Sequence, residues 1–327
     1  MKREARAAMV VAMAAAACSP RVDEYQERGD QYAAQGEYVD ARVEYGLALE
    51  EAGGDAPTGL VMKAGDLALR SKSFKEANAL FDVLIEDDPG MRDEVMALYH
   101  LYANRWVATG DTFAALQAIE WLRASDSSFN LGPLYFTVGD AAHARPDFDG
   151  AIEAYVLGLA RAGDQVPPEV YARLGDAFER KRNCPAAIEH FQSYLGAAGE
   201  EKPLAPEARY RLGACALRMA ERAFAADDWR RAMEYVELVT RTGEPVSRLD
   251  EAALLQARVY ERLGNRDAAM AQYAGIVDRN EGTQSRPVLQ AYRRLKQLEF
   301  GLPLETAERV AAEREREARR GSPGGTR

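Results

Sequence analysis

The stretch "GDQYAAQGEYVDARVEYGLAL", Gly29 to Leu49, combines a helical pattern of apolar residues with small and aromatic residues at fixed intervals. Tyr38 stands nine residues after Gly29, Ala41 follows three residues later, and Tyr45 follows four residues after that. Apolar positions that recur every three or four residues predict amphipathic helices. We therefore expect two antiparallel helices, with the glycine on the first and the alanine on the second.

The same pattern returns along the chain. It is found in "GDLALRSKSFKEANALFDVLI" (Gly65 to Ile85), "GDAAHARPDFDGAIEAYVLGL" (Gly139 to Leu159) and "GDAFERKRNCPAAIEHFQSYL" (Gly175 to Leu195). One alanine marks each unit: Ala41, Ala77, Ala115, Ala151, Ala187, Ala232 and Ala269. Their separations of 36, 38, 36, 36, 45 and 37 residues give a period near 36 with one insertion before Trp229. A period of this length indicates a repeat architecture.

These units resemble the tetratricopeptide repeat, and "LGDAFERKRNCPAAIEHF" (Leu174 to Phe191) is close to the family form. The resemblance implies an all-α fold, a right-handed α-solenoid of about seven helical hairpins over residues 23–284. Residues 285–300 are expected to form a capping helix that covers the last apolar face. Residues 301–327 are expected to form a charged helix that ends in a disordered tail.

Small and aromatic residues predict how the helices pack. We expect the glycines of the first helices to face the alanines of the second, because helices approach closely only where side chains are small. Aromatic residues are expected to wedge each hairpin open at Tyr38, Phe74, Phe148 and Trp229, and to reach the next repeat at Tyr45, Phe81, Tyr155, Phe191 and Tyr273. Cys184 occupies the wedge position of its unit. An oxidising compartment would let it pair with Cys215, but we expect both to be small core residues.

The N-terminal stretch "MKREARAAMVVAMAAAACSP" begins with basic residues and continues through an apolar run from Ala7 to Ala17. This run is shorter than the roughly 20 residues that span a bilayer, and it is typical of a signal peptide over residues 1–17. "AAAC", Ala15 to Cys18, resembles the bacterial lipobox. The resemblance implies that Cys18 is lipidated, that residues 18–22 are a linker, and that Ser19 directs the protein to the outer membrane, facing the periplasm.

Two alternatives remain open for this segment. It could be a plain signal peptide that is cleaved nearby to release a soluble periplasmic protein. It could also be retained as an ordinary helix of a cytoplasmic scaffold.

Composition excludes several functions. The formal net charge of -10 repels phosphate backbones, which argues against nucleic acid as a partner. His100, His143 and His190 are isolated, and the cysteines lack paired metal-ligand spacing. Without a phosphate-binding loop or a nucleophile elbow, we predict no catalytic residue, metal, cofactor or small-molecule substrate. The alternative is an enzyme with a site in a degenerate unit, near His100 or Glu221.

A polar residue recurs at one position of the repeat where the packing of the helices does not require it. A polar residue follows the small residue of the first helix in five units: Asp30, Asp66, Asn104, Asp140 and Asp176. It points about 100° away from the hairpin interface, and in the resembled family this direction faces the concave groove. The resemblance implies that the five residues bind an extended peptide of a partner, favouring basic or amide-rich segments. The alternative is that they are solvated helix positions.

The sequence therefore predicts a non-catalytic protein-protein interaction scaffold. It would be anchored in the bacterial envelope by lipid and would bind another envelope protein through its groove.

Overall fold

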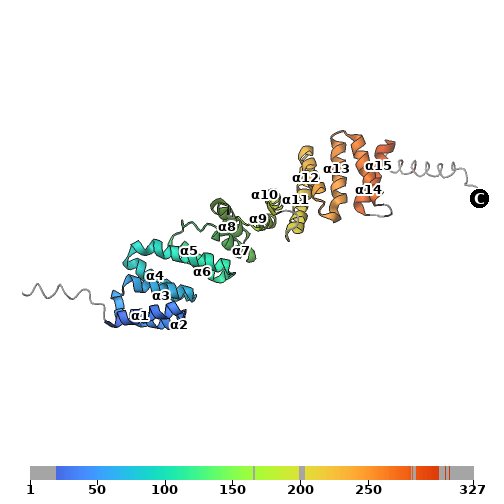
Figure 1. Cartoon of the computed structure of the whole chain (residues 1–327). Coiled ribbons are helices and arrows are strands. Elements are labelled where there is room, and N and C mark those ends of the chain that lie inside the picture. The colour runs from blue at the N-terminus through green and yellow to red at the C-terminus, as the bar shows by residue number, and fades with distance from the viewer. Residues whose placement is uncertain are drawn as a thin grey trace, which may run out of the picture. The chain divides into compact units, whose positions relative to one another are not determined.

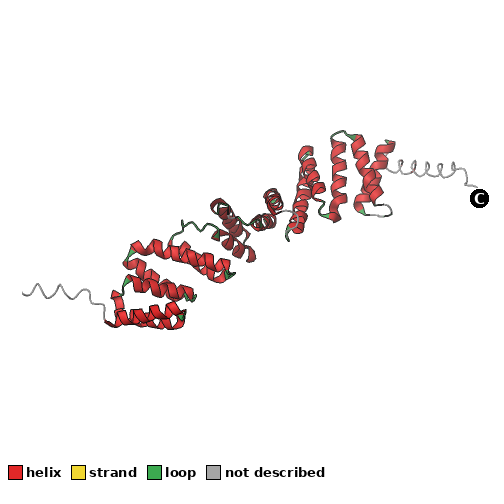
Figure 2. Cartoon of the chain, in the orientation of Figure 1, coloured by secondary structure: helices red, strands yellow, loops and turns green. Residues whose placement is uncertain are grey.

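The computed structural model describes residues 20–164, 166–198, 203–280, 282, 285–301, 306 and 309. In this part of the chain there are fifteen α-helices, three short 3-10 helices and no strand (Figure 2). The predicted all-α class is confirmed. The signal peptide, Cys18 and most of residues 301–327 lie outside the described residues. None of the described helices is long and apolar enough to cross a membrane.

Two compact units divide the chain, and each is described by itself. Unit 1 comprises Met1–Val138 with Ala160–Ala162, and unit 2 comprises Gly139–Leu159 with Gly163–Arg327. Helical hairpins stack on one another within each unit (Figure 1). The handedness of the solenoid stays a prediction.

Unit 1 holds three complete hairpins. They are α1 (Pro20–Gln35) with α2 (Tyr38–Ala52), α3 (Thr58–Arg70) with α4 (Phe74–Asp87), and α5 (Arg92–Ala108) with α6 (Thr112–Ser125). The short helices η1 (Gly53–Asp55) and η2 (Pro89–Met91) connect them. Helix α1 begins at Pro20, three residues before the predicted start of the repeats.

Helix α7 (Leu134–Ala144) begins in unit 1 and continues into unit 2. Helix α8 (Phe148–Arg161) follows, and it lies in unit 2 as far as Leu159. The further hairpins of unit 2 are α9 (Glu169–Arg180) with α10 (Cys184–Ala198), α11 (Ala205–Ala225) with α12 (Trp229–Thr242), and α13 (Leu249–Arg262) with α14 (Arg266–Arg279). Helix η3 (Val246–Arg248) precedes α13. Helix α15 (Arg286–Phe300) buries Val288 and Ala291 against the last hairpin, which confirms the predicted cap. The insertion lengthens α11, which has 21 residues.

Most hairpins turn in the same way. One residue adopts the left-handed conformation, and the amide of the next residue donates to the carbonyl five residues earlier, as in a Schellman motif. The left-handed residues in six hairpins are Gly36, Lys72, Gly110, Arg182, Asp227 and Gly264. The residue after the turn caps the second helix with its side chain at Asp111, Asn183, Asp228 and Asn265. These six turns therefore have the same length, and in three of them the left-handed residue is not glycine.

The predicted alanines are fully buried. Ala41, Ala77, Ala115, Ala151, Ala187, Ala232 and Ala269 all have 0% exposure. In four hairpins, a glycine of the first helix lies against the ring that stands 16 residues later in the same hairpin. The pairs are Gly29 with Tyr45, Gly65 with Phe81, Gly139 with Tyr155, and Gly175 with Phe191. Glycine is required here because a Cβ would overlap the ring. The predicted packing of these glycines on the alanines stays a prediction.

The wedge position is the first residue of the second helix. In four hairpins its aromatic side chain contacts the first helix of the next hairpin. Its contacts are Tyr38 with Arg70, Phe74 with Trp106, Phe148 with Arg180, and Trp229 with Arg262. We expected these rings to hold their own hairpins open. They also link neighbouring hairpins.

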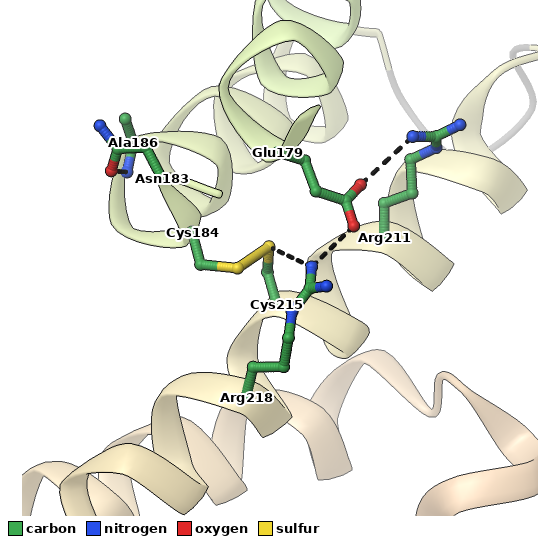
Figure 3. The surroundings of a disulfide bond; sticks show 7 residues. All are labelled: Glu179, Asn183, Cys184, Ala186, Arg211, Cys215 and Arg218. Atoms are coloured by element: carbon green, nitrogen blue, oxygen red, sulfur yellow. Dashed lines mark hydrogen bonds and ion pairs between the residues drawn. A yellow bond between two sulfur atoms is a disulfide. The ribbon is translucent and has the colours of Figure 1, made fainter. Parts of the chain in front are cut away.

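Cys184 and Cys215 form a disulfide, so the expectation that they stay unpaired is wrong (Figure 3). Their Cα atoms lie 5.2 Å apart, and both residues are buried. Cys184 occupies a wedge position on α10, and Cys215 lies 31 residues later on α11. The bond thus takes the place of the ring contact that links other hairpins. Arg218 donates to the Sγ atom of Cys215 at 3.1 Å and to Glu179 at 2.7 Å.

Candidate partner-binding groove

The five polar residues predicted to line the groove occupy equivalent places on α1, α3, α5, α7 and α9. Asp30, Asp66 and Asn104 lie in unit 1, and Asp140 and Asp176 lie in unit 2. Among the four aspartates, the exposed fraction of the side chain ranges from 42% at Asp30 to 15% at Asp176. Each of the five already has hydrogen-bond partners within the chain.

Asp30 joins three helices. The hydroxyl of Tyr45 on α2 donates to Asp30 Oδ1 at 2.6 Å, and the ammonium of Lys63 on α3 donates to Oδ2 at 2.6 Å. Burial would raise the pKa of Asp30, but the hydrogen bonds from Lys63 and Tyr45 outweigh it and lower that pKa. We call this arrangement of carboxylate, tyrosine and cation the inter-repeat clamp.

A second inter-repeat clamp lies in unit 2. Tyr155 donates to Asp140 at 2.7 Å, and Arg173 forms an ion pair with the same carboxylate. Arg173 follows Asp140 by 33 residues, as Lys63 follows Asp30. Burial and the neighbouring Asp140 raise the pKa of Tyr155, so that its hydroxyl stays a donor.

The last repeat forms the clamp from a residue that the sequence analysis missed. Arg258 interrupts the series of acids, but Glu261 lies one helical turn later on the same face of α13. Tyr273 donates to Glu261 Oε1 at 2.5 Å, and Arg294 Nε donates to Oε2 at 2.8 Å. Arg294 again follows its acid by 33 residues. Spacing of three residues on a helix could have identified Glu261.

In two hairpins, Phe81 and Phe191 stand where the clamp has a tyrosine. The carboxylates of these hairpins have other hydrogen-bond partners. Asp66 accepts from Tyr102 at 2.7 Å and pairs with Arg70. Asp176 lies 2.8 Å from Nε2 of His143 and pairs with Arg211.

Asn104 donates to the carbonyl of His100 at 2.8 Å. The four carboxylates of the series are thus neutralised internally. Binding of a partner by these five residues stays a prediction.

Unit 2 carries grooves along the face formed by its first helices. The α9–α11 groove has a volume of about 300 Å³ and has Phe191 of α10 in its lining. The α13–α15 groove has a volume of about 760 Å³ and has Tyr273 of α14 in its lining. Each is therefore bounded by two neighbouring first helices, or by a first helix and the cap, with an aromatic side chain of the second helix between them.

The remaining histidine is also part of the packing. His190 stacks on Phe178 with ring centroids 5.3 Å apart, and burial lowers its pKa. Among the residues that the structure describes, no cluster of three or more His, Cys, Asp or Glu side chains could hold a metal ion.

Residues 172–219, which run from α9 into α11, match the family model of the tetratricopeptide repeat. The chain contains tetratricopeptide repeats. Such repeats build extended concave surfaces that bind other proteins. The predicted family is confirmed, and the burial of the repeated alanines shows its packing beyond the matched segment.

Several solved structures are similar to this repeat protein. The MamA protein is 21% identical with a TM-score of 0.33, covering 59% of this chain and 97% of its own. YrrB, described as a TPR protein with an unusual peptide-binding site, is 18% identical with a TM-score of 0.33, covering 66% and 97%. Pseudomonas aeruginosa pilF is 16% identical with a TM-score of 0.27, covering 84% and 96%. No curated protein matches the sequence.

Proposed function

We propose that this tetratricopeptide repeat protein is a non-catalytic interaction scaffold that binds an extended segment of another protein along its first helices. The observation that carries this proposal is the position of the two grooves, each between consecutive first helices or between a first helix and the cap. Side chains of a bound segment could enter such hollows while its backbone follows the repeats. The seven repeated alanines that pack the hairpins are not among the residues that line these two grooves.

The proposal extends to the cell envelope. Cys18 follows the signal-peptide-like run and stands at the cysteine position of a lipobox-like sequence. The disulfide between Cys184 and Cys215 supports an oxidising compartment, since cytosolic thiols are kept reduced. It therefore favours the lipid-anchored form, or the cleaved periplasmic form, over a cytoplasmic scaffold. Lipidation of Cys18 with several acyl chains would give stable anchoring in the membrane.

A photocrosslinking amino acid at position 204 tests the interaction function. Leu204 lines the α9–α11 groove and is 36% exposed, so that an aromatic probe fits there without disturbing a buried contact. In the protein's own host we expect irradiation to give a discrete protein adduct, identified by mass spectrometry.

Val156 provides the matched control, because it is a comparably exposed apolar residue on the second helix α8. The probe at position 156 should not give this adduct. Identical adducts from the two positions, or none from either, would contradict binding along the first helices.

The intact mass of the protein extracted from host membranes tests the anchor. We expect a mass that corresponds to residues 18–327 plus acyl chains, and we expect the Cys18→Ala variant to lose the lipid. Such a modification requires cleavage directly before the cysteine. An unmodified chain that begins at Met1 would contradict the envelope proposal without affecting the scaffold.

A further inference from the structure

The α13–α15 groove is basic, although the whole chain has a net charge of -10. Its lining contains the four arginines Arg258, Arg262, Arg293 and Arg294, and a single acid, Glu261. The α9–α11 groove differs, because its arginines share the lining with Asp176 and Glu207. Charge therefore distinguishes the C-terminal groove from its neighbour.

Glu261 does not neutralise this groove. Its carboxylate accepts hydrogen bonds from Tyr273 and Arg294, which together form the inter-repeat clamp. Burial would raise the pKa of Glu261, but hydrogen bonds from Arg294 and Tyr273 lower it, so that the acid is ionised and paired at neutral pH. Arg258 adds to this lowering of the pKa through its charge, whereas the hydrogen bonds to Glu261 come from Arg294 and Tyr273. Arg258, Arg262 and Arg293 are the other three arginines of the lining.

These three arginines form no ion pair with the carboxylates that the structure describes. The Cζ atom of Arg258 lies 4.4 Å from the ring centroid of Phe224, and the Cζ atom of Arg262 lies 5.5 Å from that of Trp229. Stacking uses the flat side of a guanidinium and leaves its N–H groups as donors. Arg293 is exposed on α15 and lines the same groove. The rings hold two guanidinium groups in place before a ligand binds. Less side-chain entropy is then lost on binding.

We propose that the α13–α15 groove binds an acidic segment of the partner polypeptide, with Asp or Glu side chains paired to Arg258, Arg262 and Arg293. This inference rests on the proposed function and specifies the chemistry of the partner. Planar guanidinium groups match carboxylates in bidentate geometry.

The rest of the lining favours a polypeptide. Gln290 and Gln297 can hydrogen-bond a peptide backbone, and Phe224 and Leu254 provide apolar contacts. The prediction of a basic partner for the acidic series therefore does not extend to this end of the repeats.

Fluorescence anisotropy tests the proposal with the purified full chain. The probe is a labelled extended peptide of about ten residues, roughly 33 Å long, in which Glu alternates with Ser. A matched peptide carries Gln in place of Glu. We expect the Glu peptide to bind about tenfold tighter or more, because charged hydrogen bonds are about twice as strong as neutral ones. Added salt should weaken its binding.

Two variants with the same change in charge locate the site. Arg293→Glu should weaken binding of the Glu peptide by about tenfold, since it replaces an attraction by a repulsion. Arg230→Glu should leave binding unchanged, because Arg230 is 85% exposed on the second helix α12 and does not line the groove. Circular dichroism would confirm that both variants are folded.

Several results would overturn this inference. These are equal affinity for the two peptides, equal weakening by the two variants, or displacement of the peptide by inorganic phosphate at millimolar levels. If they occur while the probe at position 204 still captures a protein, only the acidic specificity fails. If that probe captures nothing, the proposed function itself fails.

Discussion

Replacing Gly65 by valine is expected to lower the free energy of unfolding of unit 1 by about 3 kcal/mol, at the upper end of typical overpacking costs. A Cβ at position 65 would lie 2.3 Å from Cζ of Phe81. Phe81 cannot easily move away, because it is fully buried and contacts Tyr99 edge-to-face at 5.8 Å. The ring is thus held between the backbone of α3 and the next hairpin. Valine must displace either the ring or the helix.

Gly46→Val provides the control. Gly46 lies in the middle of α2, where a Cβ would meet no atom within 4 Å. Valine should therefore change stability by no more than about 0.5 kcal/mol, because its helix propensity is slightly better than that of glycine. Urea unfolding followed by tryptophan fluorescence measures both variants. In a Trp229→Phe background the signal comes from Trp106 and Trp121, which both lie in unit 1. Equal stability of the two valine variants would show that the Phe81 ring can move aside.

The sequence predicted the features of the fold that depend on one residue at a time. A position where two helices touch requires a small residue. The same residue type therefore recurs at Ala41 and Ala269, although they lie in different units. The cap at 285–300 was predicted because the last repeat needs a cover for its apolar face. These constraints recur with the period and can be read from a single chain.

Features that depend on pairs of residues were predicted less well. The cation of the inter-repeat clamp stands 33 residues after its acid, in the next repeat. Lys63 and Arg173 therefore show no local pattern that ties them to Asp30 and Asp140. In the last repeat the acid is Glu261, which lies one helical turn after Arg258, the position that aligns with Asp30. The repeat period alone therefore does not identify it. Surfaces such as the α13–α15 groove depend on three or more helices at once, which explains why their charge was not anticipated.

The disulfide forms at a position where other repeats have an aromatic contact, and the change of residue type made this contact difficult to recognise in the sequence. At the wedge position, Tyr38, Phe74 and Phe148 each contact a side chain 32 residues later. Cys184 and Cys215, which are 31 residues apart, occupy nearly the same relation. Aligning the repeats with their successors would have placed the two cysteines side by side. Treating each as an isolated core residue did not.

Breaking this disulfide is expected to lower the free energy of unfolding of unit 2 by about 3–4 kcal/mol, because the bond closes a loop of intermediate length. The bond joins residues 31 apart and lies in the core of the fifth and sixth hairpins. Trp229 is the tryptophan of unit 2, and its fluorescence would follow urea unfolding. We expect the Cys184→Ala, Cys215→Ala double variant to unfold at a lower urea concentration than the oxidised protein.

Reduction of the native chain separates the covalent link from core packing. The reduced protein keeps both sulfur atoms in the core and loses the link alone, so its stability should fall almost to that of the double variant. Both cysteines are buried, and reductant should therefore act only after local opening. Alkylation under denaturing, non-reducing conditions provides the decisive control. If Cys184 and Cys215 are then modified in protein taken from its host, the bond does not form in the cell, and the oxidising compartment loses its structural support.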